Sequence, residues 1–321
     1  MRLELSATQA MRRLVDAIQT VIVGNRRQVE LCVIAWMVGG HVLIEDVPGV
    51  GKTLLAKALA RASGCEFDRI QFTPDLLPGD ITGANVFQPQ RGTFEFRRGP
   101  VFTQILLADE INRATPKTQA ALLEAMEERQ VTVDGSTHPL PQPFVVLATQ
   151  NPVDYQGTFA LPESQLDRFL MRVSLGYADL PGELEILERF GANSPLPDLQ
   201  PVLQPEDFLE LRQAAARVHV AEPLRAYLVR IVQRTRDHPE LALGASARAS
   251  LGLLRTSQAR ALLEGRDFVQ PDDIKDLAEP VLLHRLVLRA RAELEGSSGQ
   301  RLISELLETQ AVPVGGRQAV G

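Results

Sequence analysis

The first two-thirds of the chain alternates short runs of β-type residues with longer stretches of helical character. These runs predict five β-strands, and the central ones are almost wholly apolar, as strands buried on both faces are. Their expected bounds are 41–45, 66–72, 104–109, 144–151 and 169–175. Because helical stretches separate these runs, the pattern predicts an α/β domain built on a parallel sheet.

Two further segments predict β-hairpins. One covers residues 83–97 and turns at residues 89–92, and the other covers about 129–142. The second turns at Asp134-Gly135, a strong signal for a two-residue turn. Both segments lie between elements of the predicted sheet, so we expect insertions on one scaffold rather than a separate domain.

The pattern changes near residue 193. Residues 193–206 contain four prolines, which indicates a linker after an α/β domain over residues 1–192. Beyond it the periodicity is helical, which predicts an all-α domain over 207–310 and a disordered tail over 311–321. The expected helices are 207–218, 222–238, 246–263, 271–290 and 298–309.

Composition excludes some classes of protein. The 321 residues are 45% hydrophobic, enough for a sizeable core, and the net charge of −6 argues against duplex nucleic acid as the main ligand. The longest apolar run, residues 31–44, is interrupted by GGH and is shorter than the roughly 20 residues that span a bilayer. We expect a soluble cytoplasmic protein in which Cys32 and Cys65 are buried thiols.

Residues 45–60, EDVPGVGKTLLAKALA, have the features of a phosphate-binding loop between a strand and a helix. In such a loop, backbone N–H groups face the phosphates, the lysine reaches the β- and γ-phosphates, and the hydroxyl binds Mg²⁺. The general spacing, G-x-x-x-x-G-K-[ST], places Asp46 where the first glycine usually stands. The expected nucleotide contacts are Asp46, Val47, Pro48, Gly49, Val50, Gly51, Lys52, Thr53 and Leu54.

Polar residues end two of the predicted strands. The run ILLADE, residues 105–110, ends in two acids, and phosphoryl transfer needs one carboxylate near Mg²⁺ and often a second for the attacking water. We assign Asp109 to the metal, together with Thr53, and Glu110 to the water. Asn151 ends another buried strand, where it either contacts the γ-phosphate or the water, or serves as a turn residue.

Taken together, these motifs resemble the AAA+ ATPases, and specifically the MoxR branch of their helix-2-insert clade. The resembling stretches occur in order at 70–83, 94–135, 148–152, 161–173 and 244–254. This branch favours EDVPGxGKT over the glycine-first loop, so Asp46 departs from the general pattern and agrees with the branch. The resemblance implies a parallel-sheet P-loop NTPase core with two hairpin insertions, followed by an all-α lid domain.

The resemblance also implies roles for single residues. Lys52 and Thr53 match the first Walker motif, Asp109 and Glu110 match the second, and Asn151 matches sensor 1.

Two arginines match residues that supply positive charge to the transition state. Arg168 corresponds to the arginine finger, which enters the site of the neighbouring subunit, and Arg248 corresponds to sensor 2 on the lid. By sequence alone, either arginine reads as an ordinary surface residue. Arg113 is a candidate for an undefined role at the subunit interface, and Val23-Gly24 match the strip that packs on adenine.

The two hairpins match the helix-2 insert and the pre-sensor-1 hairpin, which touch the substrate in related machines. The resemblance therefore makes Phe94, Phe96, Asp134 and Gly135 candidates for contact with a partner.

The function that the resemblance implies is an ATP- and Mg²⁺-dependent motor that forms a homo-oligomeric ring, expected to be a hexamer, and remodels a protein client. Complex maturation or metal insertion would be the task, with a von Willebrand factor A domain adaptor. One alternative is a nucleotide-gated scaffold with little turnover, which has no need of a catalytic base. A DNA-acting motor, disfavoured by the acidic charge, and a magnesium-chelatase-type motor subunit of the same clade also stay open.

Overall fold

The structure is a computed structural model that describes residues 6–151, 157–191 and 194–313. The chain divides into two compact units, Met1–Arg212 and Gln213–Gly321. This division falls inside helix α8 (Asp207–Arg217), whereas the sequence pattern places a linker over 193–206. The described part of that segment contains only a short 3₁₀ turn, Leu196–Asp198.

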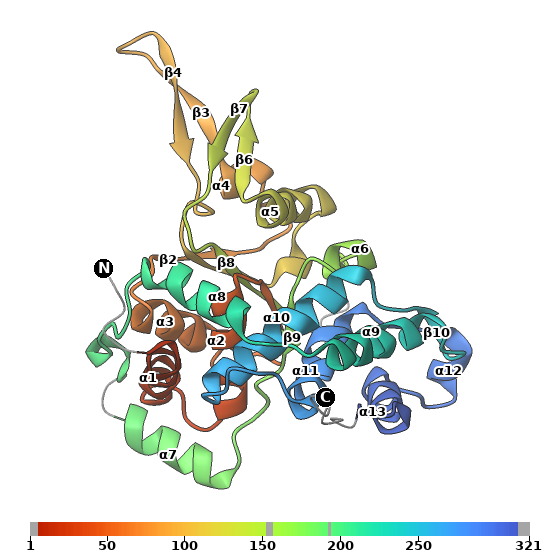
Figure 1. The fold of residues 1–321 in the computed structure, drawn as a ribbon. Helices are drawn as coiled ribbons and strands as arrows, with labels where there is room; N and C mark the ends of the chain where they lie inside the picture. The colour runs from red at the N-terminus through yellow and green to blue at the C-terminus, as the bar shows by residue number, and fades with distance from the viewer. Residues whose placement is uncertain (1–5, 152–156, 192–193, 314–321) are drawn as a thin grey trace. The chain divides into compact units, whose positions relative to one another are not determined.

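The first unit is built on a parallel five-stranded sheet in the order β2-β5-β8-β1-β9 (Figure 1). Each strand lies within one of the five predicted ranges, which confirms the α/β fold with a parallel sheet. Because β8 lies between β1 and β5, the segments that follow these three strands meet at one edge of the sheet. The strands are β1 Val42–Glu45, β2 Phe67–Gln71, β5 Ile105–Asp109, β8 Val145–Gln150 and β9 Met171–Val173.

Helices cover this sheet because its central strands are apolar on both faces. Residues 105–108 of β5 and 145–148 of β8 are completely buried. Helix α5 begins after Thr115 with Pro116 at its first position, where proline is favoured, and buries Leu122 and Leu123. The helices of this unit before α8 are α1 Ala7–Gln19, α2 Arg26–Val38, α3 Lys52–Ala62, α4 Pro78–Thr82, α5 Pro116–Glu128, α6 Glu163–Leu166 and α7 Leu180–Phe190.

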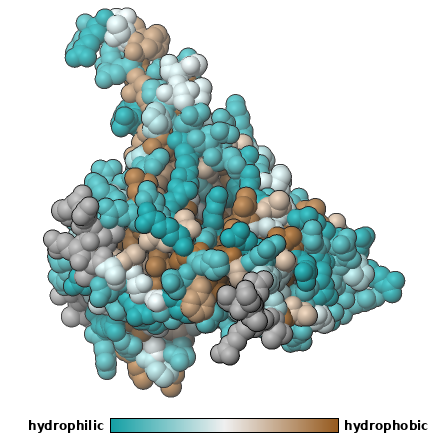
Figure 2. Space-filling model, in the orientation of Figure 1, coloured by the Kyte–Doolittle hydropathy of each residue, from teal (hydrophilic) through white to brown (hydrophobic). Residues whose placement is uncertain are grey.

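Both predicted hairpins are present and project side by side from this unit (Figure 1). The first pairs β3 (Gly83–Gln88) with β4 (Thr93–Arg98), and the second pairs β6 (Gln130–Val133) with β7 (Ser136–Pro139). Space-filling shows hydrophobic surface among hydrophilic side chains on this projecting arm (Figure 2). The hairpins therefore leave the sheet undisturbed and present an extended surface to solvent.

The second unit is mainly helical. Buried side chains from its helices, including Leu253, Ile274 and Leu302, give it a core of its own. A short antiparallel pair, β10 (Leu241–Leu243) with β11 (Val287–Leu288), is an element that the sequence pattern did not predict. The helices are α9 Glu222–Arg236, α10 Ala247–Leu263, α11 Pro271–Leu282, α12 Ala290–Leu294 and α13 Gly299–Thr309.

The single helix expected over 271–290 is wrong, because α11 ends at Leu282. Pro280 has no N–H for the helical ladder, and the guanidinium of Arg285 donates to the carbonyl oxygen of Val281. That side-chain bond takes an acceptor that a further helical turn would use. A 3₁₀ turn, Leu283–Arg285, follows and leads into β11.

Candidate functional site

The phosphate-binding loop connects β1 to α3 in the first unit. Gly49 (φ +87°) and Gly51 (φ +90°) adopt left-handed backbone conformations, which side-chain-bearing residues rarely enter. A Cβ added to either glycine would meet no other atom within 4 Å, so the backbone there borders open space. Helix α3 begins at Lys52 and points its N-terminus at this space, the arrangement that binds anions.

Lys52 lies across the loop. Its Nζ donates to the main-chain oxygen of Asp46 over 2.7 Å. Burial lowers the pKa of Lys52, while the negative charges of Asp46, Asp109 and Glu110 oppose that shift. The structure thus brings the loop lysine close enough to Asp109 and Glu110 for their charges to act on it.

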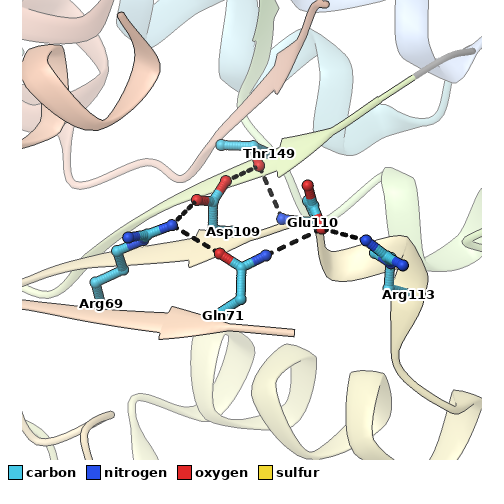
Figure 3. A network of polar contacts seen from close by, with 6 residues as sticks. All are labelled: Arg69, Gln71, Asp109, Glu110, Arg113 and Thr149. Carbon is cyan, nitrogen blue, oxygen red and sulfur yellow. Dashed lines mark hydrogen bonds and ion pairs between the residues drawn. The ribbon is translucent and has the colours of Figure 1, made fainter. Parts of the chain in front are cut away.

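The two acids lie at the carboxyl end of β5, within a polar network (Figure 3). Thr149, on β8, donates to Oδ1 of Asp109 over 2.5 Å and accepts from the backbone N–H of Glu110 over 2.8 Å. Arg69, on β2, forms an ion pair of 2.7 Å with Oδ2 of Asp109. Strands on both sides of β5 therefore fix the direction of the Asp109 carboxylate.

Glu110 has a left-handed backbone (φ +57°, ψ +50°), which is rare for a residue other than glycine and typical of functional sites. Its Oε2 accepts from Gln71 over 3.0 Å and from Arg113 over 3.1 Å. Gln71 also accepts from Arg69 over 2.7 Å, which joins both acids in one chain of contacts. Arg113, whose role the sequence left undefined, is a direct partner of Glu110.

Sequence reasoning missed Arg69, Gln71 and Thr149 as members of this site. A signal was present, since Arg69 and Gln71 are two residues apart on one strand and therefore share a face. Their strand neighbours in β5 are Leu107 and Asp109. Predicting the contact required the sheet order, which the chain's pattern alone does not contain.

A cavity of about 420 Å³ lies beside the loop. Its walls come from the segment after α1, from the loop and the start of α3, from the segment after β9, and from α7. Val23, Leu54 and Leu175 make it largely apolar, and apolar walls with few polar groups suit a flat base. Val23 thus borders this cavity, and Gly24 follows it with a φ of +63°.

The Asp46 side chain is engaged with groups of the protein, among them the backbone N–H of Val47 in the loop. Its buried carboxylate accepts hydrogen bonds from Ser174, Leu175 and Gly176, in the segment after β9. Only its main-chain oxygen faces Lys52. The structure therefore gives this side chain contacts within the protein that differ from the predicted nucleotide contact.

The remaining predicted residues occupy separate positions. Asn151 directly follows β8, and Arg168 follows α6 with its Nε 3.9 Å from the carboxylate of Glu127. Arg248 lies in the first turn of α10 in the second unit, where Ser246 accepts from its backbone N–H. The predicted roles of these three residues concern a nucleotide and a neighbouring subunit, and they stay predictions.

The predicted partner contacts on the hairpins divide into two kinds. Phe94 is 71% exposed and packs only on Phe87, with ring centroids 5.3 Å apart, among the described ring contacts. Phe96 instead stacks on His138 of the second hairpin at 4.0 Å, so it joins the two hairpins. Asp134 accepts from Asn85 over 2.6 Å, and Gly135 completes the turn beside it.

The residues present fit ATP with Mg²⁺. The loop offers a cradle of backbone N–H groups, and the cavity beside it has the size and polarity for a base. Within the described residues no group of three or more His, Cys, Asp or Glu side chains could hold a metal alone. Mg²⁺ at a nucleotide site takes one or two protein oxygens together with phosphate oxygens and water. The predicted ligands are the Thr53 hydroxyl and Asp109, whose carboxylate also bonds Thr149 and Arg69.

Comparison with known proteins assigns the family. Residues 41–171 match the model of the ATPase family associated with various cellular activities, and residues 233–306 match an AAA lid domain. In the described parts of the chain, no helix is long and apolar enough to cross a membrane.

Relatives match over nearly the whole chain. An uncharacterized Bacillus subtilis protein, YeaC, is 49% identical, and the match covers 94% of each chain. The chaperone MoxR1 of Mycobacterium tuberculosis is 43% identical over 94% of this chain and 82% of its own. A solved structure of a candidate ATPase from Cytophaga hutchinsonii is 40% identical, covers 95% of both chains and superposes with a TM-score of 0.89. The chain has the loop, the paired acids and the lid domain, and together with these relatives it belongs to the MoxR family of AAA+ ATPases.

Proposed function

We propose that this protein is an ATP-hydrolysing motor that assembles into a ring, a hexamer, and remodels protein clients. The proposal rests on three features that lie together in the first unit. They are a glycine-lined phosphate loop, a base-sized cavity and a pair of acids held at the end of β5. A protein that only bound nucleotide would need the first two features and not the third.

The chemistry follows from the residues. Lys52 and the loop N–H groups would bind the β- and γ-phosphates, and Thr53 and Asp109 would hold Mg²⁺, which neutralises phosphate charge. Glu110 would accept the proton of the attacking water, while Gln71 and Arg113 donate to its Oε2. Asn151 would orient the water or the γ-phosphate.

Two arginines would complete the site. Arg168 from the neighbouring subunit and Arg248 from the lid would supply positive charge as the transition state forms. This assignment makes turnover depend on ring assembly, because one charge comes from another protomer.

The relative MoxR1 is named a chaperone, which supports a client of protein nature. The exposed Phe94 on the projecting hairpin supports it as well, since exposed aromatic side chains are frequent at protein contacts. We extend the proposal to maturation of a client complex or metal insertion into it, with a von Willebrand factor A domain adaptor, and to a cytoplasmic location.

Two substitutions test the ATPase. Glu110→Gln removes the base and keeps the shape of the side chain, so phosphate release is expected to fall by about 10²-fold or more while ATP affinity stays within a factor of about three.

Lys52→Ala removes the positive charge that would contact the phosphates and is expected to weaken ATP binding by about tenfold or more. Calorimetric titration with ATP and Mg²⁺ measures affinity, and released phosphate measures turnover.

Matched controls are Glu124→Gln and Lys57→Ala, which change exposed residues on α5 and α3. Both controls are expected to bind and hydrolyse ATP as the wild type does. Hydrolysis by Glu110→Gln at the wild-type rate would refute its role as base. ATP binding without turnover in an assembled wild-type ring would favour the gated scaffold.

A further inference from the structure

One wall of the base-sized cavity is formed by the chain that follows β9. Leu175, Gly176 and Tyr177 line the cavity from this segment, and α7 continues the wall with Ile186 and Phe190. The segment contains a glycine with φ +68° and has no strand or helix of its own before α7. Its position relative to the phosphate loop must therefore be fixed by specific contacts.

The contacts come from Asp46, at the start of the loop. Its Oδ2 accepts from the backbone N–H of Leu175 over 2.5 Å, from the N–H of Gly176 over 2.8 Å and from the Ser174 hydroxyl over 3.2 Å. Its Oδ1 accepts from Val47 within the loop over 3.0 Å. Asp46 is only 6% exposed, and hydrogen bonds to a buried charged acceptor are among the stronger ones in proteins.

A second contact fixes the far end of the wall. Arg189, near the end of α7, donates to the main-chain oxygens of Gln19 and Thr20 over 3.0 and 3.1 Å. These two residues directly precede Val21, which also lines the cavity. The wall is thus attached to the phosphate loop at one end and to the segment after α1 at the other.

We propose that Asp46 is a positioning residue that sets the distance between the phosphate cradle and the base cavity. The inference rests on the proposed function, because it assumes that one ATP molecule occupies both. Through Asp46, the part of the site that binds phosphate and the part that binds the base are held in one geometry. A nucleotide then makes both sets of contacts without first ordering the wall, which is the energetic advantage of preorganisation.

This assignment explains why an acid stands where other phosphate loops have glycine. Glycine at that position is compatible with a phosphate cradle, as the general spacing shows. A glycine there has no carboxylate for Leu175 and Gly176. The substitution Asp46→Gly should therefore release the wall of the base cavity and change phosphate binding less than ATP binding.

The test compares two ligands, ATP and inorganic tripolyphosphate, each with Mg²⁺, in calorimetric titrations of the full chain. In the wild type, the ratio of the two affinities measures what the base and ribose add to binding. Asp46→Gly is expected to lower this ratio about tenfold, since it removes several charge-assisted hydrogen bonds, with tripolyphosphate affinity changed less than about threefold. Asp46→Asn, which keeps one acceptor oxygen, should lie in between.

Ser174→Ala removes a single donor and should lower the ratio less than Asp46→Gly does. Asp237→Asn, an exposed residue at the end of α9, is the matched control and should leave the ratio unchanged. Thermal unfolding without ligand identifies a variant that fails to fold, and in that case Asp46→Asn and Ser174→Ala decide the question.

The outcomes separate the inference from the proposed function. An unchanged ratio in folded Asp46→Gly or Asp46→Asn, with wild type binding both ligands, would overturn the positioning role alone. Equal losses for ATP and tripolyphosphate would overturn it too, because they would indicate damage to the phosphate cradle. A wild type that binds neither ligand would refute the proposed function, and the inference with it.

Discussion

At the scale of single residues, the site is organised by side chains that act through others. Thr149 can affect the site without contacting a nucleotide, because its hydroxyl donates to Asp109 and accepts from the backbone N–H of Glu110. Arg69 and Gln71 hold the same two acids from the other side. Each acid thus has its direction set by groups from a neighbouring strand, which is how a site keeps its geometry between turnovers.

His41 leads to a prediction about acid stability. Its ring is buried, with Nδ1 accepting from the N–H of Val146 over 3.0 Å and Nε2 lying 3.2 Å from the main-chain oxygen of Met126. Burial lowers the pKa of His41 to about 4, and the charge of Arg129 adds to this effect. A lowered histidine pKa means that the unfolded chain binds the proton more tightly than the folded one.

The stabilisation from neutral His41 is therefore fully present above about pH 6.5 and is lost as the pH falls toward 4. In that window the free energy of unfolding should fall by up to about 1.4 kcal/mol per pH unit more in wild type than in His41→Gln. Urea unfolding at a series of pH values measures the difference, with His238→Gln as the histidine control. Parallel curves for wild type and His41→Gln would contradict the assignment.

At the scale of elements, the β3–β4 hairpin depends on glycine at its base. Gly83 has φ +89° and ψ +173°, a region that is almost confined to glycine. A Cβ there would lie 2.2 Å from the main-chain oxygen of Arg97 and 2.6 Å from the nitrogen of Gly99. The two strands approach too closely at this point for any side chain.

Gly83→Ala should therefore destabilise the hairpin by more than the roughly 1–3 kcal/mol of backbone strain alone. Hydrogen exchange of the amides over 83–98 should become faster, while ATP affinity stays near the wild-type value because the cavity lies elsewhere in the unit. Gly92→Ala at the turn is the control, since its φ is +63° and a Cβ there meets nothing within 4 Å. Equal exchange in both variants would show that the close approach is unimportant.

The sequence predicts the secondary-structure elements that depend on neighbouring residues in the chain. The five strands follow from short runs of β-type residues, and the second hairpin follows from Asp134-Gly135, whose φ values of +49° and +79° are those of a two-residue turn. The end of α11 does not follow, because it depends on the contact of Arg285 with Val281. Likewise Asp46 is visible as an exception in the motif, but its partners become neighbours only when β9 pairs with β1.

At the scale of the whole molecule, the two units have separate hydrophobic cores. The residues predicted to act in ATP hydrolysis come from both units. Arg248 belongs to the second unit, whereas the loop and the acids belong to the first. The proposed ring adds a neighbouring protomer through Arg168. Activity should therefore depend on assembly more steeply than nucleotide binding does.

Arg168→Ala tests this dependence. Turnover per protomer should rise with protein concentration in the wild type, in step with the ring observed by sedimentation, and should be lost in the variant while the ring persists. Nucleotide affinity of the dissociated protomer should stay nearly unchanged, because the arginine acts on a neighbour's site. Arg225→Ala, an exposed position on α9, is the control. Concentration-independent turnover in wild type would rule out a finger supplied by another subunit.

Strand β2 lies at the edge of the sheet and is hydrogen-bonded to β5 on one side. An edge strand is hydrogen-bonded to one neighbouring strand, whereas an interior strand is hydrogen-bonded to two. Movement of an edge strand along its own direction therefore breaks fewer backbone hydrogen bonds. β2 carries Arg69 and Gln71, and the chain continues from it through α4 to the projecting β3–β4 hairpin. A force on that hairpin would act through one continuous stretch of backbone on Arg69 and Gln71, whose side chains bond Asp109 and Glu110. A displacement of β2 along its own direction would therefore move the partners of Asp109 and Glu110 while the other four strands of the sheet keep their pairing.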